Sequence, residues 1–151
     1  MNQHFIYNTL NHVQYFINKG EREASLAYII RLSRLLRQWM KDATKPGVSI
    51  SDELSMLSGY LTLEQMRFSG RFSFEATSSI PGSECVFITP HIIFPLAEHA
   101  VSWCLKHSEA TSIRIQISEA RPFILCTVQA EAGEESLAAS LHLLPQHNPR
   151  H

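Results

Sequence analysis

Two segments at the start of the chain carry more apolar surface than they can bury against each other. Apolar residues at helical spacing predict a helix over about residues 2–18 that ends near Gly20. A second stripe predicts a helix over about residues 21–43, and the short connection makes the two antiparallel neighbours. We therefore expect this hairpin, residues 1–45, to pair with a second chain in a four-helix bundle. The alternative is a monomer in which the hairpin packs on the rest of the chain.

The remaining residues, 46–151, predict a second, mixed unit. Ser49 is the expected N-cap of a third helix, with Asp52 three residues later, as in a capping box. The expected elements are a helix to about residue 68, a strand over 71–76, a helix from Pro90 to about residue 107 with a kink at Pro95, strands over 113–117 and 123–128, and a helix or strand over 137–144. The chain is therefore expected to be α+β, a helical hairpin followed by a small α/β sandwich.

His4 and Asn8 are four residues apart, so on a helix their side chains are stacked neighbours. The amide of Asn8 can orient the imidazole of His4 or contact a phosphoryl group on it. This pairing is typical of a histidine that accepts phosphate. A histidine near a chain start is, however, more often simply solvated.

Four sequence blocks, in one order, resemble the LytS/YehU-type sensor histidine kinases. Residues 2–11 resemble the H-box, N-P-H-F-[LI]-[FY]-N-x-L-N, with Gln3 in place of the proline. Residues 32–37 resemble the family's L-S-x-L-L-R, residues 48–54 its V-[TS]-L-x-[ED]-E-L, and residues 60–68 its Y-L-x-[LI]-E-x-x-R-F.

The resemblance implies a dimerising phosphotransfer hairpin followed by a reduced sandwich of the histidine-kinase ATPase type. It implies that His4 is the phosphoacceptor and that Asn8 positions the ring or the phosphate. Arg37 and Arg67 are weaker candidates, for which surface ion pairs are an equally good explanation.

Residues 88–105 resemble the family's ATP-binding helix, I-P-P-x-[LI]-[LI]-x-P-L-[VA]-E-N-A-I-K-H-G. The resemblance implies that Glu98 polarises the attacking group or a water near the metal; the alternative is a solvated helix residue. His99 stands in place of the asparagine that holds Mg²⁺, and imidazole is a poorer ligand for this hard cation than an amide oxygen. Ser102 replaces a lysine that neutralises phosphate, while Trp103 and Cys104 replace the last histidine and glycine.

The family's D-N-G-x-G and G-x-G-L motifs, which bind adenine and form a lid over the phosphates, are poorly matched. Residues 128–133 occupy the first position, where Glu131 is a candidate carboxylate and Gly133 a remaining glycine. No G-x-G-L follows. Either the chain stops before the lid or the nucleotide domain has decayed. The cofactors that the resemblance implies, ATP and Mg²⁺, are therefore expected to bind weakly, with His99, Glu131 and Gly133 as the candidate contacts.

Composition excludes several other functions. The chain has 13 basic and 14 acidic residues, so it lacks the net positive charge that favours direct nucleic-acid binding. Cys85, Cys104 and Cys126 lie in apolar surroundings without close spacing, which indicates a reducing, cytoplasmic setting rather than a zinc or disulfide framework. The eight histidines form no H-x-x-x-H pair on one helix, so no metal site is expected. The longest apolar run, residues 88–105, is broken by prolines and charges and is not expected to span a membrane.

The resemblance implies that the chain is the cytoplasmic part of a longer membrane sensor, attached only through segments that precede it. It would phosphorylate itself on His4 as a homodimer and pass the phosphate to a response regulator, commonly of the LytTR type. The alternative is a non-catalytic signalling module whose nucleotide domain is structural, or which receives phosphate from another kinase. A purely structural dimerisation domain would leave His4 and Asn8 unexplained.

Overall fold

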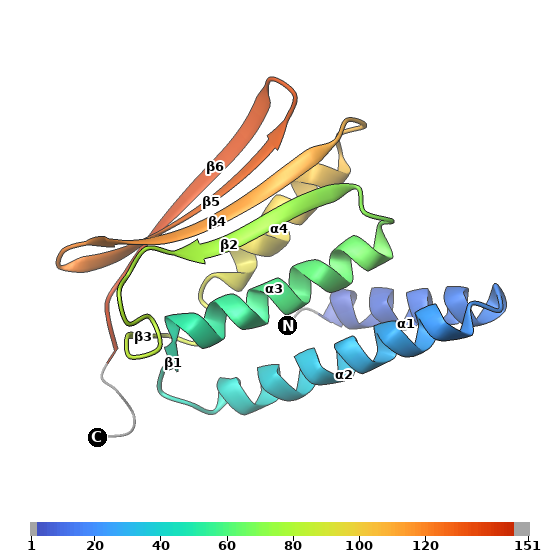
Figure 1. The fold of residues 1–151 in the computed structure, drawn as a ribbon, viewed down its shortest axis with the longest axis horizontal. Helices are drawn as coiled ribbons and strands as arrows, with labels where there is room; N and C mark the ends of the chain where they lie inside the picture. The colour runs from blue at the N-terminus through green and yellow to red at the C-terminus, as the bar shows by residue number, and fades with distance from the viewer. Residues whose placement is uncertain (1–2, 147–151) are drawn as a thin grey trace.

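The structure is a computed structural model that describes residues 3–146 and has the expected α+β fold (Figure 1). The helices are α1 (Gln3–Asn18), α2 (Arg22–Ala43), α3 (Ile50–Arg67) and α4 (Phe94–Leu105). The strands are β1 (Val48–Ser49), β2 (Phe72–Ser78), β3 (Phe87–Ile88), β4 (Thr111–Ala120), β5 (Phe123–Ala132) and β6 (Glu135–Leu143). None of these helices combines the length and hydropathy that a bilayer-spanning helix needs.

The main sheet has the order β2-β4-β5-β6, with β2 parallel to β4 and the other neighbours antiparallel. Burial alternates along β4, where Ile113, Ile115 and Ile117 are buried and the residues between them are more exposed. Helices α3 and α4 cover this buried face, and the opposite face is open (Figure 1). The strands predicted over 113–117 and 123–128 are confirmed as parts of β4 and β5.

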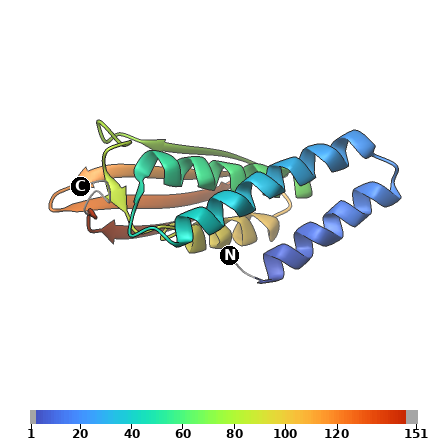
Figure 2. The same ribbon diagram turned by 90° about the horizontal axis from the view of Figure 1, so that it is seen from below.

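Helices α1 and α2 form the predicted antiparallel hairpin, which extends beyond the edge of the sandwich (Figure 2). Gly20 ends α1 with φ 73°, a left-handed conformation that glycine adopts without steric cost. Phe5 and Thr9 of α1 are buried, whereas Ile6, Leu10 and other apolar residues of the hairpin are exposed in the single chain. The four-helix bundle stays a prediction.

A chain of aromatic contacts connects all four helices. Phe5 of α1 lies 5.4 Å from Tyr60 of α3, measured between ring centroids, and Tyr60 lies 4.6 Å from Phe94 of α4. The edge of Phe94 then contacts Trp39 of α2 at 4.5 Å. Tilted and edge-on pairs at these separations are favourable beyond the area they bury. They place the start of α1 beside α3 and α4.

Helix α3 begins as predicted, but the prediction for α4 is wrong at its start. Ser49 Oγ accepts a hydrogen bond from the Asp52 N–H at 3.0 Å, the expected N-cap. Helix α4 begins at Phe94 rather than at Pro90, because the preceding loop turns through His91 with φ 60°. Pro95 falls in the first turn, where its missing N–H costs nothing, so it causes no kink.

Glu53 holds this loop from the interior. Its Oε2 accepts the backbone N–H of His91 at 3.2 Å, while its side chain is only 2% exposed. The ring of His91 stacks on Trp39 of α2 at 3.7 Å. Burial raises the pKa of Glu53 to about 7, and its Oε1 has no hydrogen-bond partner among the described residues. The loop is therefore fixed by a carboxyl group that is costly to ionise.

We expect Glu53→Gln to reduce the pH dependence of the free energy of unfolding. A carboxyl group whose pKa rises on folding contributes its full stability below its ordinary pKa of 4.5 and loses it as the pH rises through about 7. For the wild type this loss amounts to at most about 3 kcal/mol between about pH 4.5 and pH 7.5, and the glutamine variant should not show it. Urea unfolding at both pH values measures it, with the exposed Glu84→Gln as control. Equal slopes for wild type and Glu53→Gln would contradict the assignment.

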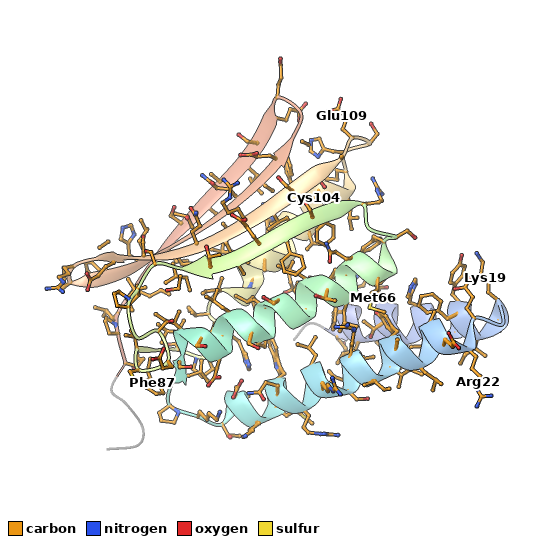
Figure 3. The ribbon with its side chains drawn as sticks, in the orientation of Figure 1. Lys19, Arg22, Met66, Phe87, Cys104 and Glu109 are labelled. Carbon is orange, nitrogen blue, oxygen red and sulfur yellow. The ribbon has the colours of Figure 1, made fainter. Side chains whose placement is uncertain are left out.

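Strands β5 and β6 are joined by a two-residue turn, Gly133–Glu134, since Ala132 pairs with Glu135. Gly133 has φ 60°, as the first position of a type II′ turn requires. A Cβ at this position would also collide with the carboxylate of Glu109, which lies at the turn between α4 and β4, beside this hairpin (Figure 3). The backbone conformation therefore demands glycine, whereas the end of the flexible Glu109 side chain can move aside.

Gly133→Ala should lower the free energy of unfolding by about as much as Gly20→Ala does. Gly20 has a similar φ of 73° and open space where a Cβ would be, so its variant measures the backbone cost alone, about 1–2 kcal/mol. Combining Gly133→Ala with Glu109→Ala should leave the loss at that level, because the Glu109 side chain can move aside. Denaturant unfolding of the three variants provides the comparison, and a larger loss for Gly133→Ala than for the double variant would show that Glu109 does not give way.

Candidate functional site

The structure brings His4 and Asn8 together on one turn of α1. Asn8 Nδ2 lies 3.1 Å from His4 Nδ1, and the His4 side chain lies on the exposed side of the helix. In this orientation the amide donates to Nδ1; with the amide reversed, its oxygen would accept from Nδ1–H and leave a lone pair on Nε2. In either orientation, Asn8 fixes the direction of the imidazole, as the spacing predicts.

The two residues line a cavity of about 320 Å³ where α1 meets α3 and α4. The amino-terminal end of α1 lies beside α4 in Figure 2. The cavity is lined by His4, Phe5 and Asn8 from α1, by Tyr60, Glu64, Arg67 and Phe68 from α3 and its end, and by Glu98, Val101, Ser102 and Leu105 from α4. The three residues expected to act on phosphate, His4, Asn8 and Glu98, therefore share one site. Arg37 is exposed on α2 and does not line it.

Two acidic side chains and one basic side chain give this cavity its electrostatic character. Arg67 Nη2 donates to Glu64 Oε2 at 2.8 Å, and Glu64 is only 2% exposed. Burial raises the pKa of Glu64 to about 7, against the opposing effect of Arg67. Burial also raises the pKa of Glu98. The cavity thus holds two carboxyl groups that take up protons more readily than exposed ones do.

Sequence reasoning missed Glu64 and underestimated Arg67. The Arg67 ion pair is buried, not the surface pair considered as an alternative, since the two side chains are 13% and 2% exposed. A signal was present in the sequence: Glu64 follows Leu57 and Leu61 at helical spacing on an apolar face. An ionisable residue at a core position is rare unless it is paired.

The candidate nucleotide contacts are not brought together. His99 is exposed on α4, which packs on the buried face of the sheet. Glu131 lies on β5 between buried Ala130 and Ala132, so its side chain projects from the opposite, open face. Gly133 forms the tight β5–β6 turn. A ligand held against α4 could not reach the carboxylate of Glu131 through the sheet.

The β5–β6 turn leaves no room for a lid between these two strands. Two residues separate β5 from β6 in the described chain. Residues 137–144, left open as helix or strand, lie mainly in β6. His107 joins the end of α4 to this hairpin, with its Nδ1 2.9 Å from the Trp103 carbonyl oxygen and its Nε2 2.8 Å from Glu135 Oε2. The two explanations for the missing lid both stay open.

Comparison with known proteins agrees with the sequence blocks. Residues 1–72 match the family model described as histidine kinase. The sensor protein LytS of Staphylococcus haemolyticus is 29% identical over 115 residues, which cover 75% of this chain and 19% of that protein. The sensor histidine kinase YesM of Bacillus subtilis is 28% identical over 130 residues, covering 85% of this chain and 22% of that protein.

A third relative, the sensor protein LytS of Bacillus subtilis, is 29% identical over 101 residues, which cover 67% of this chain and 17% of that protein. The chain thus spans about a fifth of the length of these curated relatives. The family match and the relatives agree with the predicted resemblance. They support, at modest identity, a histidine kinase region of the LytS type in this chain.

Proposed function

We propose that this chain carries the phosphoacceptor of a two-component sensor histidine kinase. His4 receives a phosphoryl group and passes it to an aspartate of a response regulator, for which the resemblance favours the LytTR type. The observation that carries this proposal is the His4–Asn8 pair, 3.1 Å apart, at a cavity shared with Glu98. By the same resemblance, the chain works on the cytoplasmic side of a membrane sensor, as part of a longer protein.

The chemistry is two nucleophilic displacements at phosphorus. A ring nitrogen of His4 attacks the phosphorus, the bond to the donor's leaving oxygen breaks, and the ring gives up its proton. A carboxylate oxygen of the regulator's aspartate then attacks the same phosphorus, and the imidazole nitrogen leaves. Asn8 keeps the ring in one orientation during both steps, which reduces the entropic cost of alignment.

The phosphoryl donor in this proposal lies outside the chain, because the residues present do not fit Mg-ATP. His99 offers an imidazole where the resemblance calls for an amide oxygen. Glu131 projects from the open face of the sheet, and a two-residue turn stands where a lid would begin. A second kinase with a complete nucleotide domain would supply the phosphoryl group, as in the non-catalytic alternative.

Autophosphorylation is the second candidate, and one observation favours it. Glu98 of α4, the helix that resembles the ATP-binding helix, lines the same cavity as His4 of the same chain. A phosphoryl donor held on α4 would therefore lie close to the acceptor. The two candidates differ only in which chain holds the donor.

A second copy of this chain is the proposed partner of the hairpin. Among the described residues, large apolar side chains are exposed along both helices; on α1 they are Ile6, Tyr7, Leu10, Tyr15 and Ile17, and on α2 they are Leu26, Ile29, Ile30 and Met40. Exposed stripes of this kind do not stabilise a monomer, whereas a four-helix bundle buries them at facing core positions. The same surface on both copies suits a twofold-symmetric interface.

Labelled ATP should phosphorylate this chain only when a complete LytS-type kinase is present. The label should be acid-labile and base-stable, should disappear in His4→Gln, and should persist in His12→Gln, the next histidine on the same helix. Label obtained with ATP alone would favour autophosphorylation. Label that survives His4→Gln would contradict both candidates.

Polar substitutions on the exposed stripes should separate the dimer without unfolding the chain. Leu10 is 55% exposed and Ile30 49% exposed in the single chain, so Leu10→Ser and Ile30→Ser remove contacts that form only between copies. Light scattering at micromolar concentration should give a two-chain mass for the wild type and a one-chain mass for the double variant. Leu144→Ser is the control, since Leu144 is 62% exposed and lies outside the hairpin. A one-chain wild type would refute the dimer.

A further inference from the structure

The buried ion pair of Glu64 and Arg67 forms one wall of the cavity that His4 enters. Its two side chains lie one helical turn apart on α3, and only one contact joins them, from Arg67 Nη2 to Glu64 Oε2 at 2.8 Å. A guanidinium and a carboxylate can form two parallel hydrogen bonds. This pair therefore uses about half of its bonding capacity.

The unused atoms of the pair are buried. Among the described residues, Glu64 Oε1 and Arg67 Nε lack hydrogen-bond partners although water does not reach them. Buried polar atoms without partners are uncommon in folded proteins, and each calls for a physical explanation. An ion pair left incomplete in this way keeps a donor and an acceptor available for a further partner.

Arg67 borders helix α1, which carries His4. It lines the cavity of about 320 Å³ with His4 and also an adjoining one of about 370 Å³ with Asn11 and His12. Asn8 lines both cavities as well. Arg67 thus borders both cavities together with Asn8, the partner of His4.

The wall holds carboxyl groups that are easier to protonate than exposed ones. Burial raises the pKa of Glu64 to about 7 and also raises that of Glu98. The titratable and charged groups around Glu64 are Arg67 and Tyr60 on α3, Tyr28 on α2, Glu98 on α4, and His4 and His12 on α1. Arg67 is the cation among them that stays charged at every accessible pH.

We propose that Arg67 binds the phosphoryl group carried by His4, and that it does so by exchanging Glu64 for the phosphoryl oxygens. The proposal rests on the assignment of His4 as the phosphoacceptor. The guanidinium keeps its charge, Glu64 takes one proton from solvent as its partner leaves, and no covalent bond changes. Arginine suits this role because its planar fork matches two phosphoryl oxygens.

Phosphoramidate, a small donor that needs no nucleotide site, tests this directly. Mass spectrometry of proteolytic peptides follows the label on His4 in the wild type, Arg67→Gln, Arg67→Lys and Glu64→Gln. The rate should fall about tenfold or more in Arg67→Gln and less in Arg67→Lys, because a charge-assisted contact is lost or weakened. It should rise in Glu64→Gln, which frees the guanidinium. Arg114→Gln, which breaks the exposed Arg114–Glu75 pair on the open sheet face, should change nothing.

The double variant Glu64→Gln with Arg67→Gln separates phosphoryl binding from a structural role. If Arg67 only neutralises Glu64, removing both should restore the wild-type rate and would overturn the proposal. If Arg67 binds the phosphoryl group, the double variant should stay as slow as Arg67→Gln. If wild type takes label on His4 and Arg67→Gln does so at the same rate, this inference is wrong and the proposed function stands. If wild type never takes label on His4, the proposed function is wrong too.

The Arg67 Nε–H resonance provides a readout that does not depend on rates. It should shift in the ¹⁵N spectrum of wild type after phosphorylation by phosphoramidate. Inorganic phosphate at millimolar concentration should leave it unshifted in His4→Gln. A phosphate-induced shift in that variant, equal to the one in labelled wild type, would show that the wall binds free phosphate and would overturn the link to His4.

Discussion

Packing around Tyr60 holds the molecule together. This side chain, 2% exposed, contacts Phe5 of α1 on one side and Phe94 of α4 on the other. Helix α3 can support both contacts because it is buried on more than one side, with one side on the sheet and another on α2. The start of α1 reaches α4 only because this helix lies between the hairpin and the sheet. Without that packing, His4 and Glu98 would not line the same cavity.

The same helix carries the two most costly groups in the core. Glu53 and Glu64 are each 2% exposed, three turns apart, and each has one oxygen without a partner among the described residues. Glu53 holds the loop before α4, whereas Glu64 faces the cavity that His4 lines. A core built for stability alone would place apolar residues at both positions. Their presence puts two ionisable groups where α3 meets the loop before α4 and the cavity beside α1.

The hairpin matches the family's features better than the sheet does. The hairpin keeps the His4–Asn8 pair and an exposed apolar stripe, both of which a phosphotransfer dimer needs. The sheet end that the resemblance assigned to nucleotide is closed by the Gly133 turn and by His107, which ties α4 to β6 through Glu135. The His4–Asn8 pair and the candidate nucleotide contact Glu131 therefore lie in separate parts of the structure.

Local patterns by themselves determined the hairpin, the Ser49 cap, the alternating strand at Ile113 and the His4–Asn8 pairing, because each depends on residues within a turn or two of one another. They failed at Pro90, where a distant carboxylate, Glu53, fixes the backbone of the loop. Only the tertiary structure decided that Glu98 and Arg67 join His4 while Glu131 faces away. Burial, sheet face and inter-helix contact depend on residues far apart in the chain, and a linear pattern does not specify which of them meet.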